Sequence, residues 1–235
     1  MKMSEIYCIV PVFHETEFKK FFASCPDYIR LVVLDNTKEN RGIPIRYNEF
    51  IDSLPEDEDA WCIFCHDDLE FLDWSFARKL ASYPRDVIVG PLGAMDDHTH
   101  KRLIQKEDVE NRAPDMLRVD TLDCMCMICH SSIFGRGLRF DEKLSWHLYV
   151  EDFCISAKLK FNLNTCVVPI SCNHYSDGQV NEEYLRHQHY LSHKYRGSQY
   201  WGTCGMIGDR IGPKRTLLQA INRIIWEKWV VISRS

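Results

Sequence analysis

Short apolar runs alternate with helix-like segments through the first half of this chain, and this alternation constrains the fold more than any other feature. The apolar runs, each as long as a buried strand, are Ile6–Val12, Leu31–Leu34, Trp61–Cys65 and Val87–Val89. The segments between them that have helical patterns are Glu15–Ala23, Ile45–Leu54 and Trp74–Ala81. Strands that alternate with helices predict an α/β fold, with a mostly parallel twisted sheet flanked by helices.

The second half of the chain is less regular. Met95–Arg118 is polar and lacks clear periodicity, so we expect a long loop, of a length that often serves as a lid. Strands are predicted in Val119–Cys129 and in Cys166–Ile170, the last clear strand, and a helix is predicted over Leu148–Leu159. From Asn181 onward we expect helices. The predicted organisation is a main domain over residues 1–180 and a C-terminal helical extension, 181–235, packed on it.

Two acids follow the third apolar run, in the sequence His66-Asp67-Asp68. The carboxyl ends of strands in open α/β sheets form the crevice that holds ligands. Carboxylates there are costly to desolvate unless a cation, hydrogen bonds or water compensate them. The segment therefore indicates a site for a hard divalent cation shared with a phosphorylated substrate. The alternative is an acidic helix N-terminus that follows the strand.

Length and charge exclude several classes of protein. A chain of 235 residues is long enough to bury a full core, and one large domain is favoured over two. The net charge of −5 argues against a nucleic-acid partner, which needs a basic surface. No segment approaches the roughly 18 uninterrupted apolar residues of a membrane span. Met1–Glu5 leads into the first strand without a signal-peptide pattern, so we expect a cytoplasmic protein.

The 11 cysteines, without a secretory signal, indicate reduced thiols. Cys124, Cys126 and Cys129 precede His130, and Cys62 with Cys65 could complete a zinc site. The same segment also alternates as a strand does, and free cysteine packs as a small hydrophobic residue. Buried strand thiols are therefore favoured over a zinc site.

Eight segments, taken in order, resemble the inverting, family 2 type of glycosyltransferase with the GT-A fold, in its bacterial glycan-assembling branch. The resemblance covers roughly Ile6–Gly178. The segments are CIVPVFHE (Cys8–Glu15), LVVLDNT (Leu31–Thr37), RYNEFIDSL (Arg46–Leu54), CHDDLEF (Cys65–Phe71), GPLGA (Gly90–Ala94), LRFDEKL (Leu138–Leu144), YVEDFCISAK (Tyr149–Lys158) and HYSDG (His174–Gly178). The resemblance implies a metal-dependent inverting transferase of polysaccharide biosynthesis, which moves a sugar from a UDP- or dTDP-sugar to a glycan or a lipid-linked glycan.

By this resemblance, the ends of the first two strands hold the nucleotide. Asp35 would bind the uracil or ribose edge, although an Asp-Asn pair after a strand also favours a turn. His66, Asp67 and Asp68 would face the diphosphate. The remaining donor-binding residues that the resemblance implies are Pro11, Val12, Phe13, Arg46 and Asn48.

The family's metal motif is usually Asp-x-Asp, and this chain departs from it because Cys65 stands where the first acid would be. Asp67 is the preferred metal ligand, with Asp68 second, and His174 matches the late histidine of such sites. The ion is Mn²⁺ or Mg²⁺, with Mn²⁺ favoured if the imidazole ligates it. The alternative for His174 is a histidine simply hydrogen-bonded at a strand end.

The resemblance also implies the acceptor side of the site. Asp152 matches the catalytic aspartate that removes the proton of the acceptor hydroxyl, and Glu151 would orient the acceptor or that base. Without the resemblance, two acids that open a helix would be taken as partners of the helix dipole. Trp146 and His147 would contact the sugar or acceptor, although a buried tryptophan is more often part of the core. Lys194 could meet phosphates.

Pro213–Ser235 is predicted to form an amphipathic helix with basic residues beside a Trp- and Ile-rich face. Peripheral contact with an anionic membrane is one interpretation. A helix packed on the catalytic domain or in a dimer contact is the favoured one.

Two other functions compete with sugar transfer. The missing first acid is compatible with a catalytically silent GT-A domain that binds a partner or a glycan. A nucleotidyltransferase would also use acids at a strand end, but Pro11-Val12-Phe13-His14-Glu15 lacks the Gly-rich phosphate loop expected after its first strand.

Overall fold

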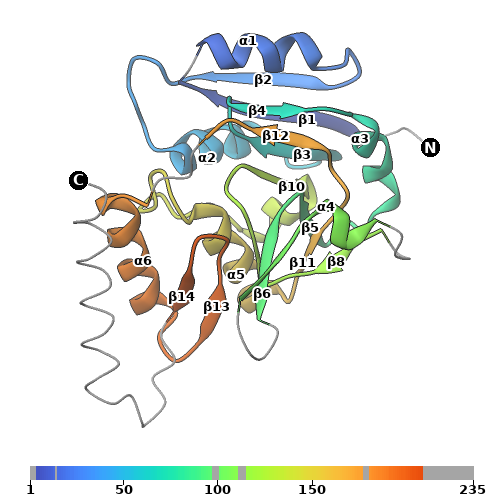
Figure 1. The fold of residues 1–235 in the computed structure, drawn as a ribbon. Coiled ribbons are helices and arrows are strands. Elements are labelled where there is room, and N and C mark those ends of the chain that lie inside the picture. The colour runs from blue at the N-terminus through green and yellow to red at the C-terminus, as the bar shows by residue number, and fades with distance from the viewer. Residues whose placement is uncertain (1–3, 14, 97–100, 111–114, 177–179, 209–235) are drawn as a thin grey trace.

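A computed structural model describes residues 4–13, 15–96, 101–110, 115–176 and 180–208 of the chain (Figure 1). These residues form a mixed α/β fold around a seven-stranded sheet with the order β2-β1-β3-β10-β5-β11-β8. Strands β2, β1, β3, β5 and β11 run in one direction, and only β10 and β8 oppose them. The predicted α/β class with a mainly parallel sheet is therefore confirmed.

The predicted strands and helices of the first half are present, with small shifts at their ends. The strands of the large sheet are β1 (Glu5–Val12), β2 (Arg30–Asp35), β3 (Ala60–Cys65), β5 (Val87–Gly90), β8 (Leu117–Arg118), β10 (Cys126–His130) and β11 (Asn164–Val167). The helices are α1 (Glu15–Ser24), α2 (Ile43–Ser53), α3 (Ser75–Lys79), α4 (Lys106–Val109), α5 (Tyr149–Phe161) and α6 (Glu182–Lys194), with short 3-10 helices at Leu80–Ser82 and Ser131–Arg136.

Alternate side chains of the central strands enter two separate cores, one on each face of the sheet. In β1, Ile9 packs on the face covered by α2 and α5, whereas Cys8 and Val10 pack on the face covered by α1 and α3. In β3, Phe64 packs on the face covered by α2 and α5, and Ile63 packs on the face covered by α1 and α3. Because β3 is buried on both faces, its sequence is a continuous apolar run rather than an alternating one.

Two stretches differ from the prediction. Met95–Arg118 is not a plain loop, because it contributes to a small antiparallel sheet of β6 (Gly93–Asp96), β7 (Lys101–Ile104) and β9 (Thr121–Leu122) and contains α4 and β8. The chain after Asn181 is not wholly helical. A hairpin of β13 (Gln199–Trp201) and β14 (Met206–Gly208) follows α6 and lies beside it (Figure 1).

A further strand lies beyond the last one predicted. Strand β12 (Cys172–His174) pairs antiparallel with β4 (Leu69–Phe71), next to the end of β3. The predicted segment Pro213–Ser235 lies outside the described residues, so its membrane contact and the division into two domains stay predictions. Within the part of the chain that the structure describes, no helix has the length and apolar character needed to cross a membrane.

Candidate active site

A cavity of about 640 Å³ opens where β1, β2 and β3 end. Its floor comes from the residues that follow these strands, and its far wall comes from the start of α5, from α6 and from the β13–β14 turn. This is the position where an open α/β sheet holds its ligand. Nine of the predicted site residues line it: Pro11, Phe13, His66, Asp67, Asp68, Trp146, His147, Glu151 and His174.

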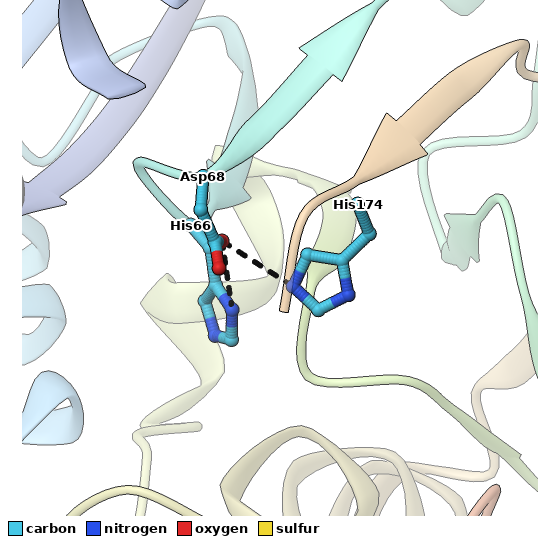
Figure 2. A group of neighbouring side chains, drawn as sticks. All are labelled: His66, Asp68 and His174. Carbon is cyan, nitrogen blue, oxygen red and sulfur yellow. Dashed lines mark ion pairs between the residues drawn. The ribbon is translucent and has the colours of Figure 1, made fainter. Parts of the chain in front are cut away.

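His66, Asp68 and His174 form a group of potential metal ligands in this cavity (Figure 2). One ligand atom from each residue lies within 4.8 Å of the others. Oδ1 of Asp68 is 3.3 Å from Nε2 of His174 and 3.8 Å from Nδ1 of His66. Two imidazoles and one carboxylate are a donor set suited to a divalent ion such as Mn²⁺ or Zn²⁺.

The pairing of β4 with β12 brings these residues together. His66 and Asp68 lie in the short turn between β3 and β4. In the antiparallel register, His174 is opposite Leu69, and the backbone N–H of Tyr175 donates to the carbonyl of Asp68 at 3.1 Å. The side chain of His174 therefore comes to lie beside Asp68, although β12 is far along the chain.

A hydrogen bond on the far side of His66 fixes the state of its ring. The Tyr149 hydroxyl donates to the carbonyl of Cys124 at 3.1 Å, so it accepts from Nε2–H of His66 at 2.7 Å. Nδ1 is then the unprotonated atom, and it faces the carboxylate of Asp68. A cation would satisfy both of these electron-rich atoms, and outer partners such as Tyr149 commonly orient metal-ligating histidines.

The pKa shifts of His66, Asp68 and His174 reflect their burial and their closeness to one another. Burial and the neighbouring His174 lower the pKa of His66, which keeps its ring neutral. Burial opposes ionisation of Asp68, but the two histidines outweigh it and lower the pKa of the carboxyl. The pKa of His174 is raised, because the contact with Asp68 outweighs the effect of its burial.

A divalent cation fits this group. Oδ1 of Asp68 and Nε2 of His174 are buried and have no hydrogen-bond partner. Buried polar atoms without a partner are rare, and a missing ion is one reason for them. His66, Asp68 and His174 are therefore the residues that would hold a cation.

Asp67 has a different position from its neighbour. Its side chain is buried, and Oδ2 accepts a hydrogen bond from the backbone N–H of Phe13 at 2.6 Å. Asp67 thus connects the residue after β1 to the turn after β3, and it is not in the metal-ligand group. That group differs from the predicted set of Asp67, Asp68 and His174 by one residue, since His66 takes the place of Asp67.

The two acids at the start of α5 have different surroundings. Glu151 is buried and lines the cavity, and its Oε2 accepts from the thiol of Cys124 at 3.0 Å. Burial and the neighbouring Asp123 raise the pKa of Glu151 to about 8. Asp152 is not among the residues that line the cavity. Its carboxylate instead accepts from Lys194 and Tyr195 at the end of α6.

Four of the residues predicted to bind the donor also lie away from the cavity lining. Val12 packs in the core. Asp35 is exposed and accepts from the N–H and hydroxyl of Thr37, which is the turn arrangement that the sequence left open. Arg46 donates to the carbonyl of Asp35 at 2.6 Å, and buried Asn48 exchanges hydrogen bonds with the backbone of Phe140. These contacts shape the loops around the cavity.

The cavity also contains residues that the sequence analysis missed. Asn36 and Thr37 line the end near β2, and Asp123, Tyr184 and Thr203 line the opposite end. The hydroxyl of Thr203 donates to Asp123 at 2.6 Å, which fixes the β13–β14 turn against the sheet. Asp123 stands just before the Cys-rich strand, so an acid at the edge of a buried strand was a signal that could have identified it. No pattern in the sequence indicates Tyr184 or Thr203.

The strand cysteines considered for a zinc site pack as core residues. Cys62, Cys65, Cys126 and Cys129 are fully buried strand residues with free thiols. Among the described residues, no cysteine belongs to a group that could hold a metal. The interpretation as buried strand thiols is confirmed.

Comparisons with known proteins agree with the architecture. No family model matches the sequence, and no curated protein is similar to it. The crystal structure of GalNAc-T7 with UDP, GalNAc and Mn²⁺ matches 74% of this chain and 44% of its own, with a TM-score of 0.54 and 12% identity. The chain thus spans less than half the length of that structure, and the similarity shows a GT-A-like fold. A197 from STIV matches 74% of this chain and 87% of its own, with a TM-score of 0.48 and 12% identity.

Proposed function

We propose that this protein is a divalent-cation-dependent glycosyltransferase of the inverting, family 2 type, which uses a nucleoside-diphosphate sugar as donor and a glycan or lipid-linked glycan as acceptor. The observation that carries the proposal is the group of His66, Asp68 and His174 in the cavity at the carboxyl edge of the sheet. The same cavity contains an acid, Glu151, on its far wall. A cation site and a buried acid that face one cavity are what transfer from a diphosphate donor requires.

The two ends of the cavity suit the two halves of such a donor. At the β1 end, the rings of Phe13 and Trp146 meet edge-to-face with centroids 4.8 Å apart, and Asn36 and Thr37 supply polar atoms nearby. An apolar aromatic wall with a few polar groups is typical of a site for a nucleoside. The ligand group lines the same cavity, and the diphosphate would lie against it. The volume of about 640 Å³ accommodates a ligand of this size.

His66, Asp68 and His174 would hold the cation, and their imidazole and carboxylate donors favour Mn²⁺ over Mg²⁺. When bound, a divalent cation supplies positive charge against the phosphates of the leaving group. Tyr149 orients His66 for this task through its hydrogen bond to Nε2. Asp67 holds the Phe13 segment at the nucleoside end. UDP, GalNAc and Mn²⁺, which are bound in the GalNAc-T7 crystal structure, are the first compounds to test.

Calorimetric titration tests the proposal directly. UDP and dTDP are titrated into the protein with Mn²⁺, with Mg²⁺ and with EDTA. We expect binding that needs the cation and that is lost in Asp68→Asn and His174→Ala. Asp57→Asn, which changes an exposed acid far from the cavity, is the matched control and should bind as the wild type does.

A panel of nucleotide sugars then identifies the donor. UDP-glucose, UDP-galactose, their N-acetyl derivatives and dTDP-glucose are incubated with Mn²⁺, and release of the nucleoside diphosphate is measured with water as acceptor. Turnover of one donor supports a transferase. A folded protein that binds neither nucleotide with any cation would refute the proposed function.

A further inference from the structure

We propose that Glu151, and not the adjacent Asp152, is the catalytic base that takes the proton of the attacking hydroxyl, and that Asp152 is a positioning residue. This inference rests on the proposed function. It reverses the roles that the resemblance implies for the two acids. The contacts of each carboxylate carry the argument.

Both oxygens of Asp152 are already occupied. Oδ1 accepts from the hydroxyl of Tyr195 at 2.7 Å and lies 2.8 Å from Nζ of Lys194, which also donates to Oδ2 at 2.9 Å. The side chain is only 2% exposed, and Lys194 is itself held by Asp141 at 2.7 Å. Burial raises the pKa of Asp152 even though Lys194 and Tyr195 oppose the rise, so its contacts, and not its affinity for a proton, set it apart from Glu151. Asp152 also does not line the cavity in which a substrate would bind.

These contacts give Asp152 a structural role. Lys194 and Tyr195 lie at the end of α6, so the ion pair fixes this end against the first turn of α5. The buried charge of Asp152 is compensated there. The helix start, which also carries Glu151, is thereby held in place.

Glu151 has the opposite environment. Its carboxyl lines the cavity that contains His66, Asp68 and His174. Its hydrogen-bond partner is the thiol of Cys124, a weak donor that leaves most of the acceptor capacity free. In the described part of the chain, no lysine or arginine forms an ion pair with Glu151. Of the two acids, it is therefore the one that can meet a substrate.

The turn of the β13–β14 hairpin packs against one side of Glu151. Gly202 approaches so closely that an added Cβ would lie 3.4 Å from Cγ of Glu151 and 3.0 Å from Ile207. Thr203 then fixes the turn through its bond to Asp123. Burial of this kind, with Asp123 nearby, raises the pKa of Glu151 to about 8. The carboxylate form, which predominates above about pH 8, is therefore a stronger base and accepts a proton more readily, as general-base catalysis requires.

The reaction balances as a single displacement. The oxygen of the acceptor hydroxyl forms a bond to the anomeric carbon while its proton passes to the carboxylate of Glu151. The bond between that carbon and the diphosphate oxygen breaks, and the nucleoside diphosphate leaves with the electron pair. The configuration at the anomeric carbon is inverted.

Adjacent substitutions test the assignment, with the donor found by the panel, Mn²⁺, and water as acceptor. Glu151→Gln should bind UDP with Mn²⁺ as the wild type does but release UDP at least about 100-fold more slowly, the usual contribution of a general base. Asp152→Asn keeps a hydrogen-bonding side chain and leaves Lys194 paired with Asp141. It should lower the melting temperature and retain more than a tenth of the turnover.

A third variant keeps the test decisive if Asp152→Asn does not fold. Glu151→Asp retains a carboxylate and should recover turnover clearly above that of Glu151→Gln. The assignment is overturned if Glu151→Gln keeps more than a tenth of the wild-type turnover, if a folded Asp152→Asn is the slower variant, or if Glu151→Asp shows no recovery. If the wild type turns over no donor, the proposed function and this assignment are both overturned. If the wild type binds nucleotide and turns over a donor, but the variants show one of the turnover patterns just described, only the assignment is overturned.

Discussion

Nε2 of His174 lies 3.3 Å from Oδ1 of Asp68, and neither atom has a hydrogen-bond partner. Nδ1 of His66 faces the same oxygen at 3.8 Å. The three groups thus face a common point where a cation could bind. Because the three groups come together only in the folded chain, binding of a cation should stabilise the whole protein.

Manganese should therefore raise the melting temperature, by an amount that grows with the logarithm of its concentration above the dissociation constant. A ligand present at about 100 times its dissociation constant adds about 2.7 kcal/mol to the free energy of unfolding. Differential scanning fluorimetry with increasing Mn²⁺ measures this shift. Asp68→Asn and His174→Ala should abolish it, and Asp57→Asn should retain it. A shift of the same size in all four proteins would place the ion elsewhere.

Asp67→Asn should show that Asp67 holds the backbone of Phe13 and does not ligate the metal ion. Asparagine can still accept from Phe13 N–H, but the neutral acceptor is weaker, so we expect a loss of about 1 kcal/mol in stability. Urea unfolding measures this loss. The Mn²⁺-dependent rise in melting temperature should remain. Its disappearance in this variant would show that Asp67 ligates the ion.

The raised pKa of Glu151 predicts how stability depends on pH. Between about 4.5 and about 8, folded Glu151 keeps a proton that the unfolded chain has lost. The free energy of unfolding contributed by this group is therefore fully present at low pH and falls as pH rises through about 8. Urea unfolding of the metal-free protein at pH 6 and pH 9 measures the effect.

Glu151→Gln provides the comparison, because glutamine does not ionise. The wild type should lose more of its free energy of unfolding than Glu151→Gln does as pH rises from 6 to 9. Asp57→Asn should lose as much as the wild type. Parallel curves for Glu151→Gln and the wild type would show that Glu151 is ionised throughout this range.

Lys194→Met should destabilise the protein by about 3 kcal/mol, because it leaves the buried carboxylate of Asp152 without its cation. Urea unfolding at pH 7 gives the magnitude. The double variant Lys194→Met with Asp152→Asn removes the uncompensated charge and should recover part of the loss. Lys158→Met, which removes an exposed lysine at the other end of α5, is the control. If Lys194→Met costs no more than this control, the ion pair does not hold the helix start.

The core of the fold was predictable because its strands carry strong local signals. The apolar runs of β1 and β3 are long and buried on both faces, so they are visible without a structure. Strand β12 has only three residues, and its central residue, Asn173, is exposed. Such a strand is stabilised by its partner β4 and not by its own pattern, which is why the prediction missed it.

The candidate site was predictable to the level of segments but not of side chains. His66, Asp67 and Asp68 were expected at the end of β3, yet the N–H of Phe13 decides which acid turns toward the sheet. Glu151 and Asp152 are likewise adjacent in one helical turn, and the contact of Asp152 with Lys194 decides which one faces the cavity. These choices depend on residues distant in sequence, so no local motif contains them.

The pairing of β4 with β12 has a consequence for the order in which this protein becomes functional. Two members of the ligand group are made early during synthesis, but the third arrives only after more than a hundred further residues, on a strand that must find β4. A nascent or truncated chain that ends before β12 lacks the third ligand. Cation affinity thus reports that the two distant halves of the chain have joined, and an ion captured there ties them together.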